Sequence, residues 1–424
     1  MNARSLFTTA LLGLSLSVLA ACGGSNTKLA DANPKKFDPQ VMEAELRAIY
    51  ENRVVGFSYA INHKGQLARS GAWGLARRDV DGTLAMTAET RHNLASVSKT
   101  VNAIYFLRLK GWINGLMGTE YVSLDRSVSQ WLPRDWVQGY GFFGDDGVTF
   151  RQLLAHRSGL GQMFDAMTPQ DREYWDNDWD GLQFVVANGA NPGDDFSYKN
   201  ANHALFRFLV PELLHRSGLN PFIPPLTPPF EIDPSPDEYG QKYLANMNQR
   251  IMKPLDIDDV GCSYQESENH ARFYEFRYPL LPGKRHHLDA GVCGGHAGLM
   301  MSAVEVAKLL AYARYTDVLL TDADRDAMIE DRLGWAQSDK EALWDDATAR
   351  LLQSGVWLSR YTGDDLYLPD GTVAVNPRAE QHNCVMQFPR NVEAVLLINS
   401  SLKPGTSSPC SALEQAFEAA LVDA

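Results

Sequence analysis

Four consecutive residues, Ser96 to Lys99, have the side-chain spacing that could make a serine nucleophile. Ser96-Val97-Ser98-Lys99 puts a hydroxyl and an amine one helical turn apart, on the same face. A neutral lysine can take the hydroxyl proton, and burial or a neighbouring cation lowers the lysine pKa enough for this. The alternative is a helix N-cap serine followed by a surface lysine.

The residues around Ser96 predict the elements that position it. Apolar residues recur after Ser96 at helical spacing: Val97, Val101, Ile104 and Tyr105. This spacing predicts a buried helix that ends at Gly111. Upstream, residues 54–61 and 66–73 have strand composition and flank a turn, so they predict a hairpin. At a junction between sheet and helix, the helix dipole lowers the serine pKa and backbone N–H groups can bind an oxyanion.

Four further segments extend the pattern: Thr149–Leu160, Pro192–Asn200, Lys253–Ile257 and Gly294–Ser302. With the Ser-x-x-Lys motif they resemble, in order and rough spacing, the family of class C β-lactamases, D-Ala-D-Ala carboxypeptidases and related esterases. The first resembles the family's T-I-R-x-L-L-x-H-x-S-G-L, and the second its P-G-x-x-F-x-Y-x-N. The resemblance spans roughly Phe57 to Asn399.

The resemblance implies a role for each motif residue. Ser96 would be the acylated nucleophile, and Lys99 would assist its deprotonation. Tyr198 would shuttle protons, and Asn200 would orient Lys99 and the substrate amide. Without the other motifs, Tyr198 would read as a half-buried tyrosine that covers an apolar surface. His156 lies in a segment that is structural in the family, so we do not expect it to take part in the chemistry.

The resemblance also implies a β-lactamase/transpeptidase-like fold of the α+β type. An antiparallel sheet flanked by helices would be built from both ends of the chain, with an all-helical subdomain inserted. The expected boundaries are a signal peptide at 1–21, a lipidated polar tether at 22–37 and a hydrolase domain at 38–424. Within that domain we expect a sheet part at 38–106 and 300–424, and a helical part at 107–299.

The remaining sequence predicts the other elements of this fold. We expect helices at 39–52 and from Ser408 onward, and strands at 351–361, 382–388 and 393–399. Residues 220–236 are proline-rich and predict an extended surface loop. Its apolar side chains either cover the active site or form a packed surface excursion.

The third motif of the family departs from its pattern here. The family has Lys-Thr-Gly or His-x-Gly on the strand that faces the serine. Counting back from Phe388-Pro389 without gaps places this motif near Val373–Val375, which has no suitable side chain; Tyr361-Thr362-Gly363 and His382-Asn383-Cys384 resemble remnants. An oxyanion N–H needs no particular side chain. Because the cation of this motif cannot be placed, β-lactams and D-Ala-D-Ala peptides are less favoured as substrates, since their carboxylate needs that cation as a partner.

The N-terminus predicts export and lipidation. Arg4 precedes an apolar run, Leu6–Leu19, that is too short to span a bilayer. Leu19-Ala20-Ala21-Cys22-Gly23 resembles a bacterial lipoprotein cleavage box, which implies a diacylated Cys22. In a Gram-negative host, Gly23 in place of Asp favours the periplasmic face of the outer membrane. The alternative is an ordinary secretory signal that happens to contain a cysteine.

The other four cysteines predict disulfides in an oxidising compartment, where four thiols allow three pairings. We favour the sequence-local pairs Cys262–Cys293 and Cys384–Cys410 over four free buried thiols. We expect no metal site, because the sequence has no Cys-x-x-Cys or His-x-x-x-His spacing.

Composition narrows the function. The 424 residues carry a net charge of −13, which argues against nucleic acid and against an electrostatic grip on anionic lipids. We expect a monomer without a cofactor that hydrolyses an ester or amide bond of a small or peptidoglycan-derived molecule through a Ser96 acyl-enzyme. One alternative is a β-lactamase or D-Ala-D-Ala carboxypeptidase. The other is a lipid-anchored binding protein that has lost turnover.

Overall fold

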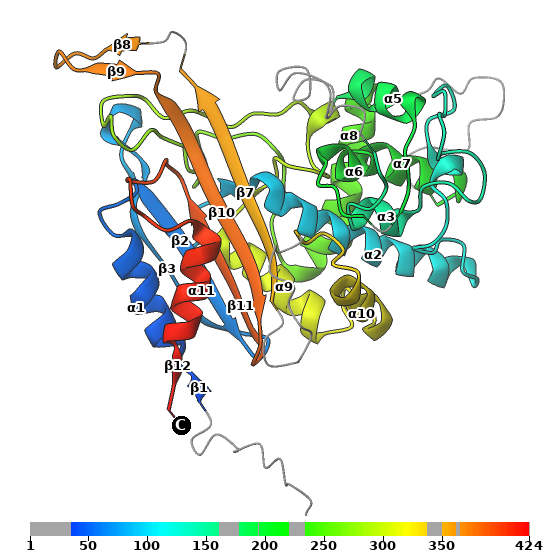
Figure 1. Ribbon diagram of the computed structural model, residues 1–424, viewed down its shortest axis with the longest axis horizontal. Coiled ribbons are helices and arrows are strands. Elements are labelled where there is room, and N and C mark those ends of the chain that lie inside the picture. Colours follow the sequence, from blue (N-terminus) through cyan, green and yellow to red (C-terminus); the bar gives the residue numbers. More distant parts are fainter. Residues whose placement is uncertain are drawn as a thin grey trace, which may run out of the picture.

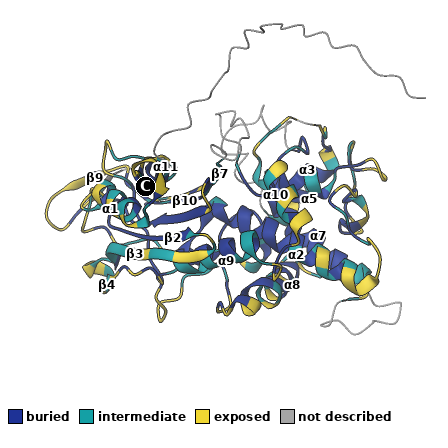
Figure 2. Cartoon of the chain, turned by 90° about the horizontal axis from the view of Figure 1, so that it is seen from below, coloured by how far each residue is buried: buried dark blue, intermediate teal, exposed yellow. Residues whose placement is uncertain are grey.

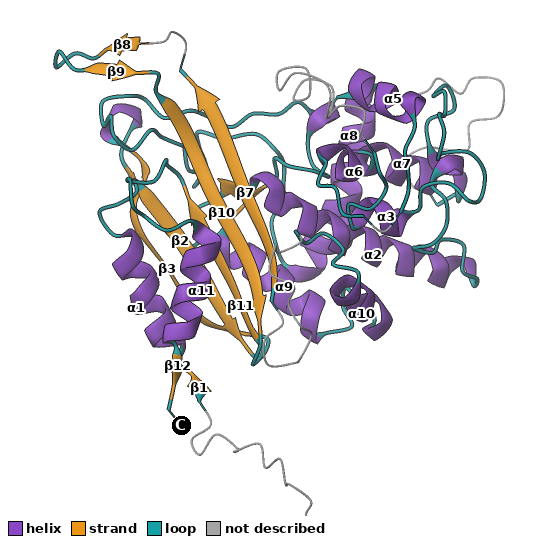
Figure 3. Cartoon of the chain, in the orientation of Figure 1, coloured by secondary structure: helices purple, strands orange, loops and turns teal. Residues whose placement is uncertain are grey.

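The computed structural model describes residues 35–160, 178–193, 195–219, 234–336, 350–361 and 365–423. The predicted signal peptide, the lipidation site Cys22 and nearly all of the proline-rich loop lie outside these residues. Figure 3 shows the architecture, a sheet of long strands with helices on both of its faces and a cluster of helices beside it. In the described parts of the chain, no helix is long and apolar enough to cross a membrane.

The main sheet joins the two ends of the chain. Its six strands lie in the order β4-β3-β2-β11-β10-β7, and the neighbouring strands pair antiparallel. Their bounds are β2 Gly56–His63, β3 Gln66–Arg77, β4 Leu84–Ala85, β7 Leu351–Arg360, β10 Arg378–Phe388 and β11 Val392–Ile398. β10 begins at Arg378 rather than at the expected His382, because its first residues pair with the end of β7. The predicted antiparallel sheet flanked by helices is confirmed.

Apolar side chains on both faces hold the helices against the sheet. On one face, α1 (Pro39–Tyr50) and α11 (Pro409–Ala419) pack through Leu46 and Phe417 against buried residues of β2, β10 and β11. On the other face lies α9 (Ala303–Tyr315), which contacts β2 and β11 (Figure 1). The central strands β2 and β11 are therefore buried on both faces, whereas β3 and the second half of β7 are partly exposed.

The helix after Ser96 is longer than the sequence predicts. α2 spans Ser98–Met117 and ends at Gly118, whose φ of +64° is the left-handed conformation of a helix C-cap. The predicted end at Gly111 is wrong. A Cβ at that position would meet no atom within 4 Å, so Gly111 lies inside the helix without a tertiary contact that would stop it.

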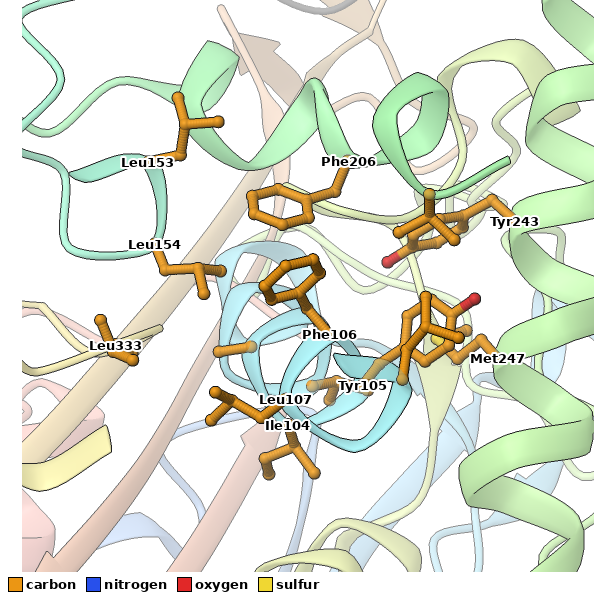
Figure 4. Close-up of a cluster of buried hydrophobic side chains, with 14 of the residues drawn as sticks. Ile104, Tyr105, Phe106, Leu107, Leu153, Leu154, Phe206, Tyr243, Met247 and Leu333 are labelled. Carbon is orange, nitrogen blue, oxygen red and sulfur yellow. The ribbon is translucent and has the colours of Figure 1, made fainter. Parts of the chain in front are cut away.

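The helical cluster packs around α2. It contains α3 (Phe150–Leu154), α5 (Trp179–Asn188), α6 (Asn200–Ala204), α7 (Phe206–Arg216) and α8 (Pro236–Met247), with α10 (Asp322–Glu330) nearby. The Phe106 ring of α2 contacts the rings of Phe150 and Phe206, with centroids 4.5 and 5.0 Å away, and Figure 4 shows it beside Phe206. The first half of α2 is buried, while exposed residues gather on the outer helices and loops (Figure 2). This packing gives the residues after Ser96 a fixed position.

Smaller elements complete the fold. Among the described residues, short two-stranded sheets pair β1 (Lys36–Phe37) with β12 (Leu421–Val422), β5 (His92–Asn93) with β6 (Met300–Met301), and β8 (Asp365–Tyr367) with β9 (Val373–Val375). The structure joins Cys262 to Cys293 and Cys384 to Cys410, with Cα–Cα distances of 5.6 and 5.3 Å. The second bond ties β10 to α11.

Candidate functional site

Ser96 lies in a single 3₁₀ turn, Ala95–Val97, that leads directly into α2. The turn follows the short strand β5, so the serine sits between strand and helix, where the sequence analysis expects it. Its hydroxyl is therefore close to the N-terminus of a 20-residue helix. The helix dipole at that end favours negative charge that develops on oxygen.

The amine of Lys99 connects the residues of this site. Its Nζ lies 3.0 Å from Ser96 Oγ and donates to Asn200 Oδ1 and to the backbone carbonyl of His296, both at 2.8 Å. The Lys99 side chain is fully buried. The structure thus brings Ser96, Lys99 and Asn200 together, although α6 carries Asn200 far along the chain from α2.

These three contacts fit an ammonium that donates to all three oxygens, and they also fit a neutral amine that donates to two of them and accepts from Ser96. A neutral amine has two N–H donors and one lone pair, whereas an ammonium has three donors and no lone pair. The Asn200 amide oxygen and the His296 carbonyl can only accept, so they occupy both N–H groups of the neutral amine. The lone pair is then directed to the Ser96 hydroxyl. This arrangement is the one a general base requires.

Burial and charge shift the pKa of both Lys99 and Tyr198. Burial lowers the pKa of Lys99 from its usual 10.5, while the charge and hydrogen bond of Tyr198 act in the opposite direction. Burial acts to raise the pKa of Tyr198, but the Lys99 charge and hydrogen bonds with Lys99, Ser96 and Gln353 outweigh it and lower the pKa from 10.0. The two groups therefore titrate as a coupled pair.

Tyr198 is held over Lys99 by an aromatic contact. Lys99 Nζ lies 4.9 Å from the centroid of the tyrosine ring, and the His156 ring stacks on it with centroids 4.5 Å apart. His156 Nδ1 accepts the backbone N–H of Lys199 at 3.3 Å. Burial, together with the Lys99 charge, holds the pKa of His156 far below 6.5, so this imidazole stays neutral. His156 therefore supports Tyr198.

The strand that faces Ser96 is β7. A Cβ added to Gly355 would lie 2.6 Å from Leu94 O and 3.0 Å from Ser96 N, so the strand backbone lies against the nucleophile turn. Two residues earlier, buried Gln353 donates from Nε2 to the Tyr198 hydroxyl at 3.5 Å. Gln353-Ser354-Gly355 thus stands where the family pattern has Lys-Thr-Gly.

Two of the sequence-based positions for this motif do not lie on the strand that faces Ser96. Val373–Val375 forms β9, in a separate sheet with β8, and His382-Asn383-Cys384 lies on β10, the neighbour of β7. Tyr361 follows the last residue of β7, and Thr362 and Gly363 lie outside the described residues. Counting without gaps fails because the chain forms the β8–β9 hairpin between β7 and β10.

Sequence reasoning missed three contributors: Gln353, Gly355 and the carbonyl of His296. The pair Ser354-Gly355 inside a predicted strand is the signal that points to the first two, once the search no longer requires a cation. His296 lies in the recognised Gly294–Ser302 segment, but a backbone carbonyl leaves no signature in a side-chain sequence.

Comparison with known proteins agrees with the fold described above. Residues 38–227 match the family model described as Beta-lactamase. The solved structure of EstCE1, described as a hydrolase with promiscuous acyltransferase activity, is 18% identical with a TM-score of 0.59, over 90% of this chain and 99% of that one. The chain has the β-lactamase/transpeptidase-like fold.

Other structures with the β-lactamase/transpeptidase-like fold match at similar levels. FmtA from Staphylococcus aureus is 14% identical with a TM-score of 0.56, over 92% of this chain and 91% of that one. The D-amino acid amidase from Ochrobactrum anthropi SV3 is 18% identical with a TM-score of 0.52, over 90% of this chain and 98% of that one. At such identities the likeness shows the fold, and the chemistry must be argued from the site itself.

The coupled pair predicts how activity depends on pH. Because Lys99 must be neutral to accept a proton, kcat/KM should fall as the pH drops through the pKa of the pair. Tyr198 raises the pKa of Lys99, so Tyr198→Phe should move this acidic limb to lower pH while it reduces the maximal rate. The pH profile of ester hydrolysis by the two proteins measures both effects. A flat wild-type profile, or a shift to higher pH in the variant, would contradict this assignment.

Proposed function

We propose that this chain is a serine hydrolase of the β-lactamase-related family that cleaves an ester or amide bond through an acyl-enzyme on Ser96. The observation that best supports this is the position of the Lys99 amine, 3.0 Å from Ser96 Oγ and bonded to the oxygens of Asn200 and His296. Serine is a poor nucleophile at neutral pH without a base. A protein that only binds its ligand would not need this arrangement.

In the acylation step, Ser96 Oγ attacks the substrate carbonyl carbon while its proton passes to Lys99 Nζ. Backbone N–H groups stabilise the resulting oxyanion, and the closely opposed backbones of Ser96 and Gly355 are the candidates for this role. The tetrahedral intermediate then breaks its bond to the leaving alcohol or amine. That group takes the proton from Lys99, directly or through the Tyr198 hydroxyl.

In the deacylation step, water attacks the acyl-enzyme carbonyl and gives a proton to the Lys99–Tyr198 pair. The second tetrahedral intermediate breaks its bond to Ser96 Oγ, which takes the proton back. The carboxylic acid product leaves, and the starting enzyme is restored. Ser96, Lys99 and Tyr198, the protein groups that would move these protons, lie in contact with one another.

Gln353 favours a neutral substrate over a β-lactam or a D-Ala-D-Ala peptide. The position that supplies a cation in the family pattern here holds a buried amide beside Tyr198. A substrate carboxylate placed there would lose its hydration without gaining a charged partner. We therefore place uncharged esters and amides first and carboxylate-bearing substrates second.

Replacing the nucleophile tests the proposed reaction. Ser96→Ala should abolish hydrolysis of p-nitrophenyl esters and labelling by a fluorophosphonate probe, with an unchanged far-UV CD spectrum. Lys99→Ala should lower the acylation rate by about 10²–10⁴-fold, as expected when a general base is lost. Wild-type turnover in Ser96→Ala would refute the assignment. Absence of turnover and labelling in the wild type would favour the binding-protein alternative.

A charge substitution tests the proposed substrate class. The wild type should hydrolyse a neutral p-nitrophenyl butyrate with a kcat/KM higher than that of the p-nitrophenyl hemisuccinate, by about tenfold or more. Gln353→Lys should reduce this preference, because it supplies a partner for the carboxylate. The matched control, Gln353→Met, should keep the preference of the wild type. A wild type that prefers the hemisuccinate would overturn the substrate ranking.

We further propose that Cys22 anchors the protein to the periplasmic face of the outer membrane. The support is the sequence around Cys22 and Gly23. Cys22→Ser should move the protein from the membrane fraction to the soluble fraction, or leave it unprocessed. Fractionation after mild lysis, with the wild type as reference, measures this. A wild type that is already soluble in the periplasm would leave only the export signal.

A further inference from the structure

The residue before the nucleophile is in an unfavourable backbone conformation. Ala95 has φ +47°, in the left-handed region that residues with a Cβ rarely occupy. Such conformations persist only when the surrounding structure enforces them. Because Ser96 follows immediately, the conformation of Ala95 sets the direction in which Ser96 Oγ points.

Asn93 supplies the contact that enforces this conformation. Its Oδ1 accepts the backbone N–H of Ala95 at 2.8 Å, and its Nδ2 lies 3.1 Å from His286 Nδ1. Its backbone carbonyl accepts the Nδ2 of Asn383 on β10 at 2.8 Å. Asn93, His286 and Asn383 are all buried, so these bonds form away from water. The bonds hold Asn93 at its side chain and at its backbone.

The same segment is fixed relative to the partner of Lys99. β5 pairs Asn93 with Met300, and the Leu94 N–H donates to Leu299 O at 2.8 Å. The chain just before Leu299 carries the His296 carbonyl that accepts from Lys99. The segment that directs Ser96 Oγ is therefore hydrogen-bonded to the segment whose His296 carbonyl holds the proposed base, Lys99.

We propose that Asn93 is a positioning residue that holds Ala95 in the left-handed conformation and thereby directs Ser96 Oγ toward Lys99. This inference rests on the proposed role of Ser96. Without the Asn93 amide, the Ala95 N–H loses its buried acceptor, and Ala95 relaxes toward negative φ. Ser96 Oγ then moves away from the 3.0 Å contact with Lys99.

A double-mutant cycle between positions 93 and 95 tests this directly. Asn93→Ala should lower kcat for a p-nitrophenyl ester by about 10- to 100-fold with little change in KM, because a misplaced nucleophile reacts slowly but leaves binding intact. Glycine adopts positive φ without steric cost. Ala95→Gly in the Asn93→Ala background should therefore restore kcat to within about threefold of Ala95→Gly alone.

Several outcomes distinguish this proposal from a structural role. Rates are expressed per active site, titrated with the fluorophosphonate probe, so that loss of folded protein does not count as loss of rate. A double variant as slow as Asn93→Ala, or a wild-type kcat in Asn93→Ala, would overturn the proposal. If Ser96→Ala keeps turnover, the proposed function fails instead, whatever the cycle shows.

A second variant covers the case in which Asn93→Ala does not fold. Asn93→Ser keeps a short oxygen acceptor that can bond the N–H two residues ahead. The kcat of Asn93→Ser should fall by less than is expected when the acceptor is removed completely. Adding Ala95→Gly to this variant should restore the part of kcat that was lost. If Ala95→Gly leaves that loss unchanged, Asn93 does not act through the Ala95 conformation.

Discussion

The burial of the Lys99 amine is the constraint on which the rest of the site depends. An amine removed from water costs much less when it is neutral, so burial lowers its pKa and makes a proton acceptor available. No ion pair in the described parts of the chain includes Lys99. Its two N–H groups are instead held by two neutral oxygens, those of Asn200 and His296. The site supplies dipoles rather than counter-charges.

The fold meets this constraint by bringing together segments that lie far apart in the sequence. α2 carries Ser98 and Lys99, α6 carries Asn200, and the loop before β6 carries His296. That loop contains Gly294 and Gly295 at φ +80° and +67°, a conformation that lets the backbone turn its carbonyl toward the amine. Apolar packing around Phe106 keeps α2 in place. The hydrophobic core thus fixes the geometry of a polar site.

β7 contributes to the site through its backbone at Gly355 and through one side chain, Gln353. Its backbone lies against Ser96 through Gly355, where any larger residue would meet Leu94 O and Ser96 N. Its side chain at Gln353 contacts Tyr198 but carries no charge. The groups that would move protons are therefore all present, while the group that would bind an anion is replaced by an amide. Because Gln353 also hydrogen-bonds the Tyr198 hydroxyl and acts to lower the Tyr198 pKa, a change at this position would alter both substrate charge preference and acid–base behaviour.

Much of this site can be predicted from the sequence, because its motifs are local. The Ser96–Lys99 spacing lies within one helical turn, and Tyr198 and Asn200 belong to one short segment, so periodicity and resemblance suffice to select them. The hairpin and the last two strands follow from their composition and turns. The predicted end of the first helix at Gly111 is wrong, because a glycine alone does not stop a helix that packing continues to stabilise.

The distant groups that meet these motifs could not be predicted, because long-range contacts place them. Gln353 and Gly355 face the site because of the register between β7 and β10 and because the β8–β9 hairpin lies between these strands in the sequence. A motif does not encode the length of such an insertion, so counting along the sequence misses these residues. The His296 carbonyl bonds Lys99 as a backbone group, which every residue has. Asn383 contacts Asn93 across 290 positions of sequence. Local motifs therefore identify the candidate side chains, whereas the long-range strand register and loop closure set which groups surround them.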